Sequence, residues 1–199
     1  MQHLLLTNRN RIRKLNQMKK ISKAFIILCI PVLLGMLFYK CSSTETKTDA
    51  WDYETNYDQY FGFVPDDFRV IKTDDAHSGK FVTKMDTAFP FSLTLVKNFG
   101  QLTNKKAKAV EVQTWAKCAV ANAPVFIVVS MEYPGNPTPV YYEFFDATTA
   151  MKDANTWTKL NATFYLPKTI DPNISFKAFV WNKGQTIAYA DDFALRFVE

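Results

Sequence analysis

The chain contains few cysteine, histidine and glycine residues. Of its 199 residues, three are cysteine, two are histidine and six are glycine. Only Cys118 lies beyond residue 41, so the rest of the chain cannot form an internal disulfide and must be held together by packing. One histidine (His77) and one cysteine cannot complete a zinc site there, and no glycine-rich phosphate loop occurs. The small numbers of these residues exclude a domain stabilised by disulfides, a zinc enzyme and a nucleotide-binding loop.

Acidic residues are absent from residues 1–41, which contain eight of the 24 Lys and Arg residues. Residues 42–199 therefore carry 16 bases against all 19 acids. The formal net charge of +5 comes from the N-terminal segment alone. It gives no support for nucleic-acid binding, and we expect no nucleic-acid partner.

An uncharged apolar run extends from Ala24 to Tyr39 and follows a cluster of bases. As a helix it would reach about 24 Å, which is short for a bilayer core of about 30 Å but suits a signal-peptide core. Cys41 follows the run and precedes a polar stretch, an arrangement that resembles a bacterial lipoprotein signal with Cys41 as the lipidated residue. An uncleaved single-pass membrane anchor is the alternative. Both interpretations export residues 42–199 to the cell envelope, because the bases mark the cytoplasmic side. A translation start at Met18 is a further hypothesis, since Met18 immediately precedes two lysines and this run.

The chain is therefore expected to have three parts. Residues 1–41 form the basic and apolar signal or anchor segment, residues 42–60 form a polar tether, and residues 61–199 form the folded domain. Aromatic residues in the second half of the tether suggest that it packs along the domain.

Short alternating segments dominate the folded domain and predict an all-β, antiparallel two-sheet β-sandwich of the jelly-roll kind. The run Val125–Val129 is continuously apolar, which is typical of a strand covered on both faces. A short helix near Thr148–Asp153 is the only helix expected. About nine strands are predicted, in the segments Phe68–Thr73, Lys80–Met85, Phe91–Val96, Val110–Cys118, Val125–Val129, Val140–Phe145, Leu160–Leu166, Ile174–Val180 and Ile187–Phe197.

Asp191 is the most informative polar residue of the domain. It falls in register with Tyr189 and Phe193, which predicts that it points inward, whereas Asp192 points the other way. A buried carboxylate needs hydrogen-bond donors or a cation. Asp191 is therefore either a ligand to a structural calcium or an acceptor of backbone amides from a neighbouring loop.

Two tryptophans in the outward register are candidates for binding carbohydrate. Trp115 shares its strand face with Glu111 and Gln113, and Trp181 shares its face with Lys177. An indole can stack on a sugar ring while neighbouring polar groups reach its hydroxyls. The alternative is that both tryptophans only cover a sheet face, as large aromatic residues often do.

Enzymatic chemistry has little support in the sequence. Asp191 and Asp192 diverge on one strand, so they cannot serve together as the two carboxyls of a glycosidase. Cys118 lies in the inward register and is expected to be a small core residue. We therefore expect no enzyme.

Three motifs occur in order along residues 60–199: Asp75–Lys80 (DAHSGK), Trp157–Leu166 leading to Pro167, and Ile187–Leu195 (IAYADDFAL). Together they resemble the galactose-binding-like jelly rolls of carbohydrate-binding modules. The resemblance implies an eight- or nine-stranded jelly roll, a glycan partner and a structural calcium with Asp191 as ligand. Export combined with this fold is similar to the surface glycan-handling lipoproteins of Bacteroidetes-type bacteria.

These observations predict a non-catalytic carbohydrate-binding module displayed on the bacterial cell envelope and held at the membrane by its N-terminus. A structural or adhesive envelope protein that contacts other proteins is the main alternative. A small glycan hydrolase is less favoured.

Overall fold

The computed structural model describes residues 50–58, 69–136 and 138–199. The chain divides into two compact units, Met1–Thr48 and Asp49–Glu199, and all described residues belong to the second. The predicted signal or anchor segment and Cys41 lie outside the described residues. Within the described ranges, no helix is both long and apolar enough to cross a membrane.

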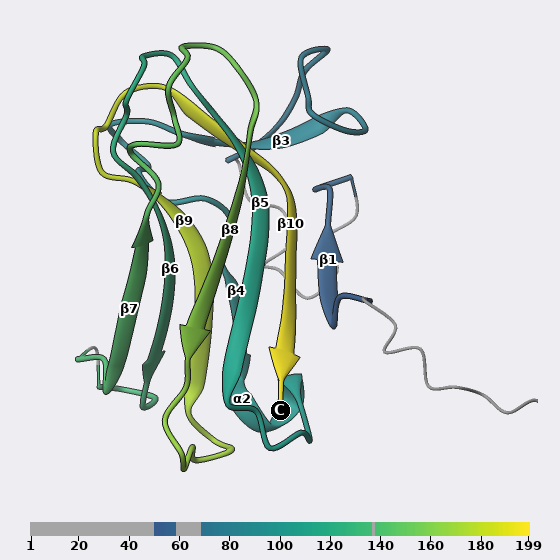
Figure 1. Cartoon of the computed structure of the whole chain (residues 1–199), viewed down its shortest axis with the longest axis vertical. Helices are drawn as coiled ribbons and strands as arrows, with labels where there is room; N and C mark the ends of the chain where they lie inside the picture. Colours follow the sequence, from purple (N-terminus) through teal and green to yellow (C-terminus); the bar gives the residue numbers. More distant parts are fainter. Residues whose placement is uncertain (1–49, 59–68, 137) are drawn as a thin grey trace, which may run out of the picture. The chain divides into compact units, whose positions relative to one another are not determined.

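The second unit is a sandwich of two antiparallel sheets (Figure 1). One sheet has six strands in the order β2-β3-β10-β5-β8, with β1 paired to β10, and the other has four in the order β4-β9-β6-β7. The predicted all-β, two-sheet fold is confirmed. The strands are β1 (Tyr53–Thr55), β2 (Val70–Lys72), β3 (Phe81–Met85), β4 (Leu95–Asn98), β5 (Ala109–Cys118), β6 (Val125–Glu132), β7 (Tyr141–Asp146), β8 (Thr158–Tyr165), β9 (Ser175–Asn182) and β10 (Ala188–Val198).

The core lies between the two sheets, where alternate side chains of facing strands meet. In β9, Phe176, Ala178 and Val180 are buried, while the intervening residues are partly exposed. β6 departs from this alternation, because its residues from Val125 to Met131 are all buried. This is the strand covered on both faces that the sequence predicts. Cys118 is a free, fully buried core residue, as expected, and burial raises the pKa of its thiol to about 11.

Two elements differ from the expectations. β1 lies within the predicted tether and pairs with β10 from Tyr53↔Leu195 to Thr55↔Phe193, so the sandwich begins by Tyr53 and not at Phe61. Backbone pairing and the burial of Tyr57 fix this segment to the domain. The described residues contain a short helix, α2 (Phe99–Leu102), while the segment 148–153 forms turns and no helix.

A β-bulge in β10 reverses the predicted register of its first half. The pairing with β5 shifts between Asp191 and Ala194, and Asp192 adopts a left-handed backbone with φ +47°. An extra residue in one strand moves the following side chains to the opposite face. As a result Asp191 shares the outer face of the sheet with its cross-strand partner Trp115. The prediction that Asp191 points into the core was wrong, although Asp191 is fully buried.

Candidate functional site

The two sheets separate the predicted binding residues into two groups. Glu111, Gln113 and Trp115 lie on the outer face of β5 in the six-stranded sheet, whereas Lys177 and Trp181 lie on the outer face of β9 in the four-stranded sheet. The outer faces of a two-layer sandwich point away from each other. The structure therefore provides two candidate surfaces, and no single surface combines both tryptophans.

The outer face of the four-stranded sheet carries a continuous group of aromatic rings, which we call the aromatic platform. Its members are Phe91, Phe126, Tyr142, Phe144, Phe179 and Trp181. The ring centroid of Trp181 lies 6.0 Å from that of Phe91 and 5.6 Å from that of Phe126. The series continues from Phe126 to Phe144 at 5.3 Å. The rings thus extend across β9, β6 and β7.

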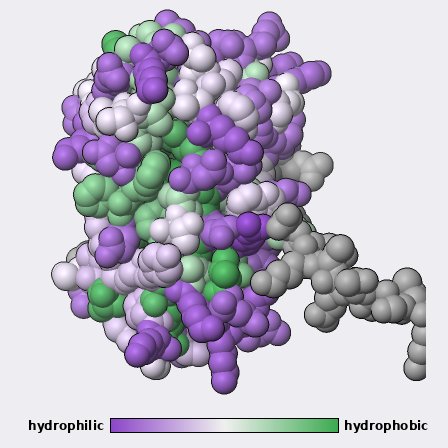
Figure 2. Space-filling view, in the orientation of Figure 1, coloured by the Kyte–Doolittle hydropathy of each residue, from purple (hydrophilic) through white to green (hydrophobic). Residues whose placement is uncertain are grey.

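The platform is exposed at its β7 side. Phe144 and Tyr142 keep 55% and 45% of their surface exposed, which is unusual for large aromatic residues in a strand. Hydrophobic residues also gather visibly around β6 and β7 in a surface that is otherwise largely hydrophilic (Figure 2). Exposed apolar groups of this kind are found at the contact surfaces of proteins, so the platform is a candidate contact surface.

Polar side chains border the aromatic platform. Lys177 forms an ion pair with Glu132 across β9 and β6, and the residue directly opposite Lys177 on β6 is Ser130. At the opposite end, Lys183 lies over the rings of Phe126 and Trp181, with its ammonium 5.4 Å and 5.8 Å from their centroids. The rings are therefore flanked by groups that can donate and accept hydrogen bonds.

The outer face of the six-stranded sheet contains a groove of about 820 Å³, which we call the Trp115 groove. Cross-strand pairing places Glu54, Ala194 and Gln113 in one row across β1, β10 and β5. The small side chain of Ala194 leaves a depression between larger neighbours. The described residues that line the groove are Trp51, Asp52, Tyr53, Glu54, Thr55, Asn56, Asp58, Ser78, Gln113, Trp115, Asp192, Phe193 and Ala194.

Glu111 lies one row further along β5 and does not line this groove. Its carboxylate accepts a hydrogen bond from Nε of Arg196 at 2.6 Å, and the Arg196 guanidinium lies 5.1 Å from the ring centroid of Trp51. Glu111 therefore acts through Arg196 to support Trp51 at one end of the groove.

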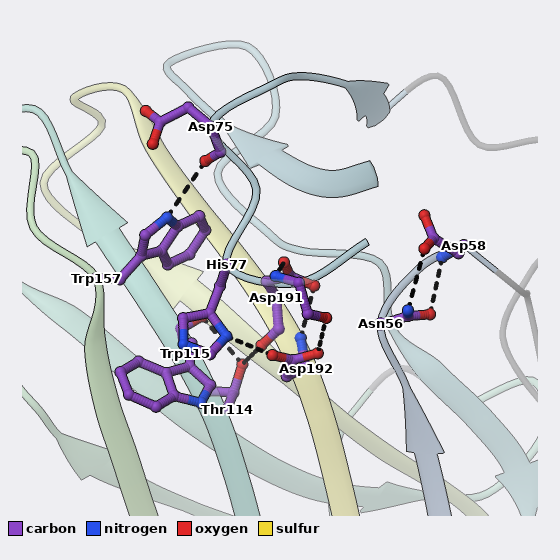
Figure 3. A network of polar contacts seen from close by, with 10 residues as sticks. Asn56, Asp58, Asp75, His77, Thr114, Trp115, Trp157, Asp191 and Asp192 are labelled. Carbon is purple, nitrogen blue, oxygen red and sulfur yellow. Dashed lines mark hydrogen bonds and ion pairs between the residues drawn. The ribbon is translucent and has the colours of Figure 1, made fainter. Parts of the chain in front are cut away.

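The segment 74–80 covers the other end of the groove, beside Trp115 (Figure 3). The imidazole of His77 stacks on the Trp115 indole, with ring centroids 3.8 Å apart, and its Nδ1 lies 2.5 Å from Oδ2 of Asp192. The hydroxyl of Ser78 also donates to Asp192. The sequence analysis singled out the His-Ser-Gly motif but did not identify His77 as the partner of Trp115.

Asp191 is buried beneath this segment and accepts backbone amides. The amide of Ser78 donates to Oδ2 at 3.0 Å, and the amide of Asp192 donates to Oδ1 at 2.7 Å. Burial raises the pKa of Asp191 to about 6, and the amides of Ser78 and Asp192 oppose that rise. The loop-amide alternative considered from the sequence matches these contacts.

The surroundings of Asp191 do not fit a calcium ion. Calcium is held by six to eight oxygen ligands, but both carboxylate oxygens of Asp191 face N–H donors. No cluster of three or more His, Cys, Asp or Glu side chains suited to a metal occurs in residues 50–58, 69–136 and 138–199. The carboxylate of Asp191 is satisfied here by amides of the chain itself, and structural calcium at this position stays a prediction.

Lys117 is a buried cation that the sequence did not single out. It lies on the outer face of β5 yet is almost fully buried, with its ammonium 4.7 Å from the ring centroid of Trp157 and 5.2 Å from that of Tyr189. It also forms an ion pair with Asp75, whose main-chain oxygen accepts the indole N–H of Trp157. Lys117 and Trp157 thereby fix the segment 74–80 to the sheet. Figure 3 shows the hydrogen bond from Trp157 to Asp75.

Comparisons with known proteins show similarity in fold. No family model and no curated protein matches the sequence. The tandem CBM22-1–CBM22-2 domain of Paenibacillus barcinonensis Xyn10C superposes with a TM-score of 0.53 at 10% identity, over 75% of this chain and 51% of that chain. The CBM22-1–GH10 modules of Clostridium thermocellum endo-1,4-β-D-xylanase 10B, in complex with xylohexaose, give a TM-score of 0.50 at 13% identity, over 76% of this chain and 29% of that one. The sandwich is thus similar to that of carbohydrate-binding modules.

Proposed function

We propose that this protein is a non-catalytic carbohydrate-binding module that binds a glycan chain on the aromatic platform. The observation that carries the proposal is the group of exposed rings Phe91, Tyr142 and Phe144 with the partly exposed Trp181. The buried ring of Phe126 lies between Trp181 and Phe144 and supports both. Aromatic faces bury the apolar face of a sugar ring, and several rings in succession suit successive sugar units of a chain. The similarity in fold to xylan-associated modules supports this proposal.

The polar border of the platform supplies the second requirement of glycan binding. Sugar hydroxyls that lose water on binding need hydrogen-bond partners, or the lost hydrogen bonds weaken binding. The ion pair of Lys177 and Glu132 lies beside the rings and offers both a donor and an acceptor. A purely apolar docking surface would not need such a pair.

The adjacent pair Asp191 and Asp192 is not arranged as the two carboxyls of a glycosidase. Asp191 is buried, and Asp192 is held by His77 and Ser78, so this pair does not face a common cleft. A glycosidase needs two carboxyls about 5 to 9 Å apart that face the scissile bond from both sides.

Display on the cell envelope is part of the proposal. The apolar run before Cys41 supports either lipidation at Cys41 or an uncleaved anchor. Either would hold the sandwich at a membrane and leave residues 42–199 exported. Labelling of the expressed protein with radioactive palmitate, with a Cys41→Ala variant as control, distinguishes the two.

The binding proposal is tested by titrating the full chain with xylohexaose and a broad glycan array, in a detergent that carries no sugar headgroup. Trp181→Ala and Phe144→Ala are expected to weaken binding by about tenfold or more, because stacking of an aromatic ring is worth on the order of 1–2 kcal/mol. Tyr165→Ala is the matched control, since Tyr165 is an aromatic residue with 80% exposure on the other sheet. Equal weakening by all three variants would contradict a site on the platform.

Protein contact is the second candidate function for the same platform. The exposure of Val140, Tyr142 and Phe144 at the β7 edge favours it, because an exposed apolar edge is also suited to a protein partner. A folded protein that binds no glycan on the array would favour this candidate over carbohydrate binding.

A further inference from the structure

We propose that the Trp115 groove is a second saccharide site, distinct from the aromatic platform, and that it binds the end of a short neutral oligosaccharide. The groove measures about 820 Å³, within the range of about 300–1,000 Å³ that is typical of small-ligand sites. It lies on the outer face of the six-stranded sheet, and the platform lies on the four-stranded sheet. A ligand in the groove therefore does not depend on binding at the platform.

Two indoles line the groove. Trp115 projects from β5, and Trp51 comes from the segment that leads into β1. Neither ring is loosely held. His77 stacks on one face of Trp115, and the guanidinium of Arg196 lies 5.1 Å from the ring centroid of Trp51. Rings fixed in advance lose little conformational entropy when a ligand binds, which favours affinity.

The floor between the indoles is small and polar. Ala194 contributes only a methyl group, and its cross-strand neighbours Glu54 and Gln113 flank it. The Gln113 amide can donate and accept hydrogen bonds, and the Glu54 carboxylate accepts them. A depression with an amide and a carboxylate beside aromatic rings suits a polyhydroxylated ring better than a purely apolar ligand.

The charge of the lining selects against acidic ligands. Four carboxylates line the groove, from Asp52, Glu54, Asp58 and Asp192, and the described lining residues include no Lys or Arg. Lys105 forms an ion pair with Asp52 and His77 contacts Asp192, so the negative charge that a ligand meets comes mainly from Glu54 and Asp58. A uronic acid or sulfated sugar would bring a like charge into this groove, which costs binding free energy. The hydroxyls of a neutral sugar would instead donate to the carboxylates.

The four tryptophans allow each site to be observed separately. The full chain is labelled with 5-fluorotryptophan, and its four fluorine resonances are assigned with single Trp→Phe variants in a detergent without a sugar headgroup. The ligands are xylotriose and β-1,4-galactotriose as neutral probes and trigalacturonate as the acidic probe. We expect a neutral trisaccharide to shift the Trp51 and Trp115 resonances together with one saturation curve, and trigalacturonate to leave them unmoved at the same concentration.

Variants separate this proposal from the proposed function. Gln113→Leu keeps the size of the side chain and is expected to weaken the shared Trp51 and Trp115 response by about tenfold, the equivalent of one lost hydrogen bond of about 1.4 kcal/mol. Trp181→Phe is expected to leave that response unchanged. A change confined to the Trp181 resonance would contradict a site in the groove and support binding at the platform. A change confined to the Trp51 and Trp115 resonances would support a site in the groove and contradict binding at the platform.

Two further outcomes would overturn the groove proposal. Saturation with both neutral probes that leaves Trp51 and Trp115 unmoved rules out a saccharide site there. Equal affinity for trigalacturonate rules out selection by the carboxylates.

Discussion

The imidazole of His77 lies parallel to the indole of Trp115, with ring centroids 3.8 Å and planes 17° apart. The stack joins the segment 74–80 to the outer face of β5. It covers one face of the indole, so only the rest of the ring lines the groove. The hydrogen-bonding distance from His77 to Asp192 fixes the imidazole in turn to the bulge of β10. The β-bulge, the loop and the groove are therefore one structural unit.

The burial of Asp191 within this unit predicts how the stability of the fold depends on pH. The pKa of Asp191 is about 6 in the fold and about 3.8 when the chain is unfolded. Between these two pH values the folded state binds more protons than the unfolded state. The contribution of Asp191 to the free energy of unfolding is therefore fully present below about pH 4 and is lost as the pH rises through 6. In the parent chain we expect the free energy of unfolding to fall by on the order of 3 kcal/mol across this window, and we expect the Asp191→Asn variant to lack this fall. Urea denaturation at several pH values measures it.

The exposed Asp153 provides the control for this experiment. Asp153→Asn should retain the same pH dependence as the parent chain. A parent chain whose stability rises steadily from pH 4 to 6, with Asp191→Asn behaving identically, would contradict the assignment.

Calcium removal is expected to leave the fold unaffected. Because the Asp191 carboxylate accepts the amides of Ser78 and Asp192, it is satisfied without a cation. A thermal melt of the protein in excess chelator should give the same Tm as in calcium. A loss of several degrees that calcium alone restores would instead support the metal site implied by the family resemblance.

Lys117 is expected to be a stability determinant of the segment 74–80. Its buried stem and its ammonium between Trp157 and Tyr189 hold Asp75 against the sheet. We expect Lys117→Ala to lower the free energy of unfolding by about 2 kcal/mol, because packing, a cation–π contact and an ion pair are lost together.

Lys105→Ala is the comparison for this variant. Lys105 forms a partly exposed ion pair with Asp52 at 2.8 Å, and such pairs contribute at most about 1 kcal/mol. If both variants lower the free energy of unfolding by the same amount, the burial of Lys117 does not add to the stability of the fold.

The sequence by itself determined the sandwich. Alternation of apolar and polar residues is a local property of each strand. When one face of a strand must be buried, this period of two residues identifies which side chains face the core. This is why strands such as β8 and β9 and the fully covered β6 were predicted correctly. The burial of Cys118 followed from the same register.

The sequence also indicated candidate binding residues, but not their grouping. Register places Trp115 and Trp181 on outward faces of their strands. It contains no information on which strands share a sheet, because strand order depends on pairings between distant segments. The assignment of the two tryptophans to opposite sheets required the tertiary structure.

Only the tertiary structure decided the environment of Asp191 and the existence of the groove. A bulge adds a single residue to β10 and reverses the side-chain register beyond it, and no local pattern marks that insertion. The pairing of β1 with β10 brings Trp51 near Trp115 across a long stretch of chain. Alternation along a strand depends on its own residues, whereas a groove depends on which distant backbones pair, and that is settled only when the whole chain packs.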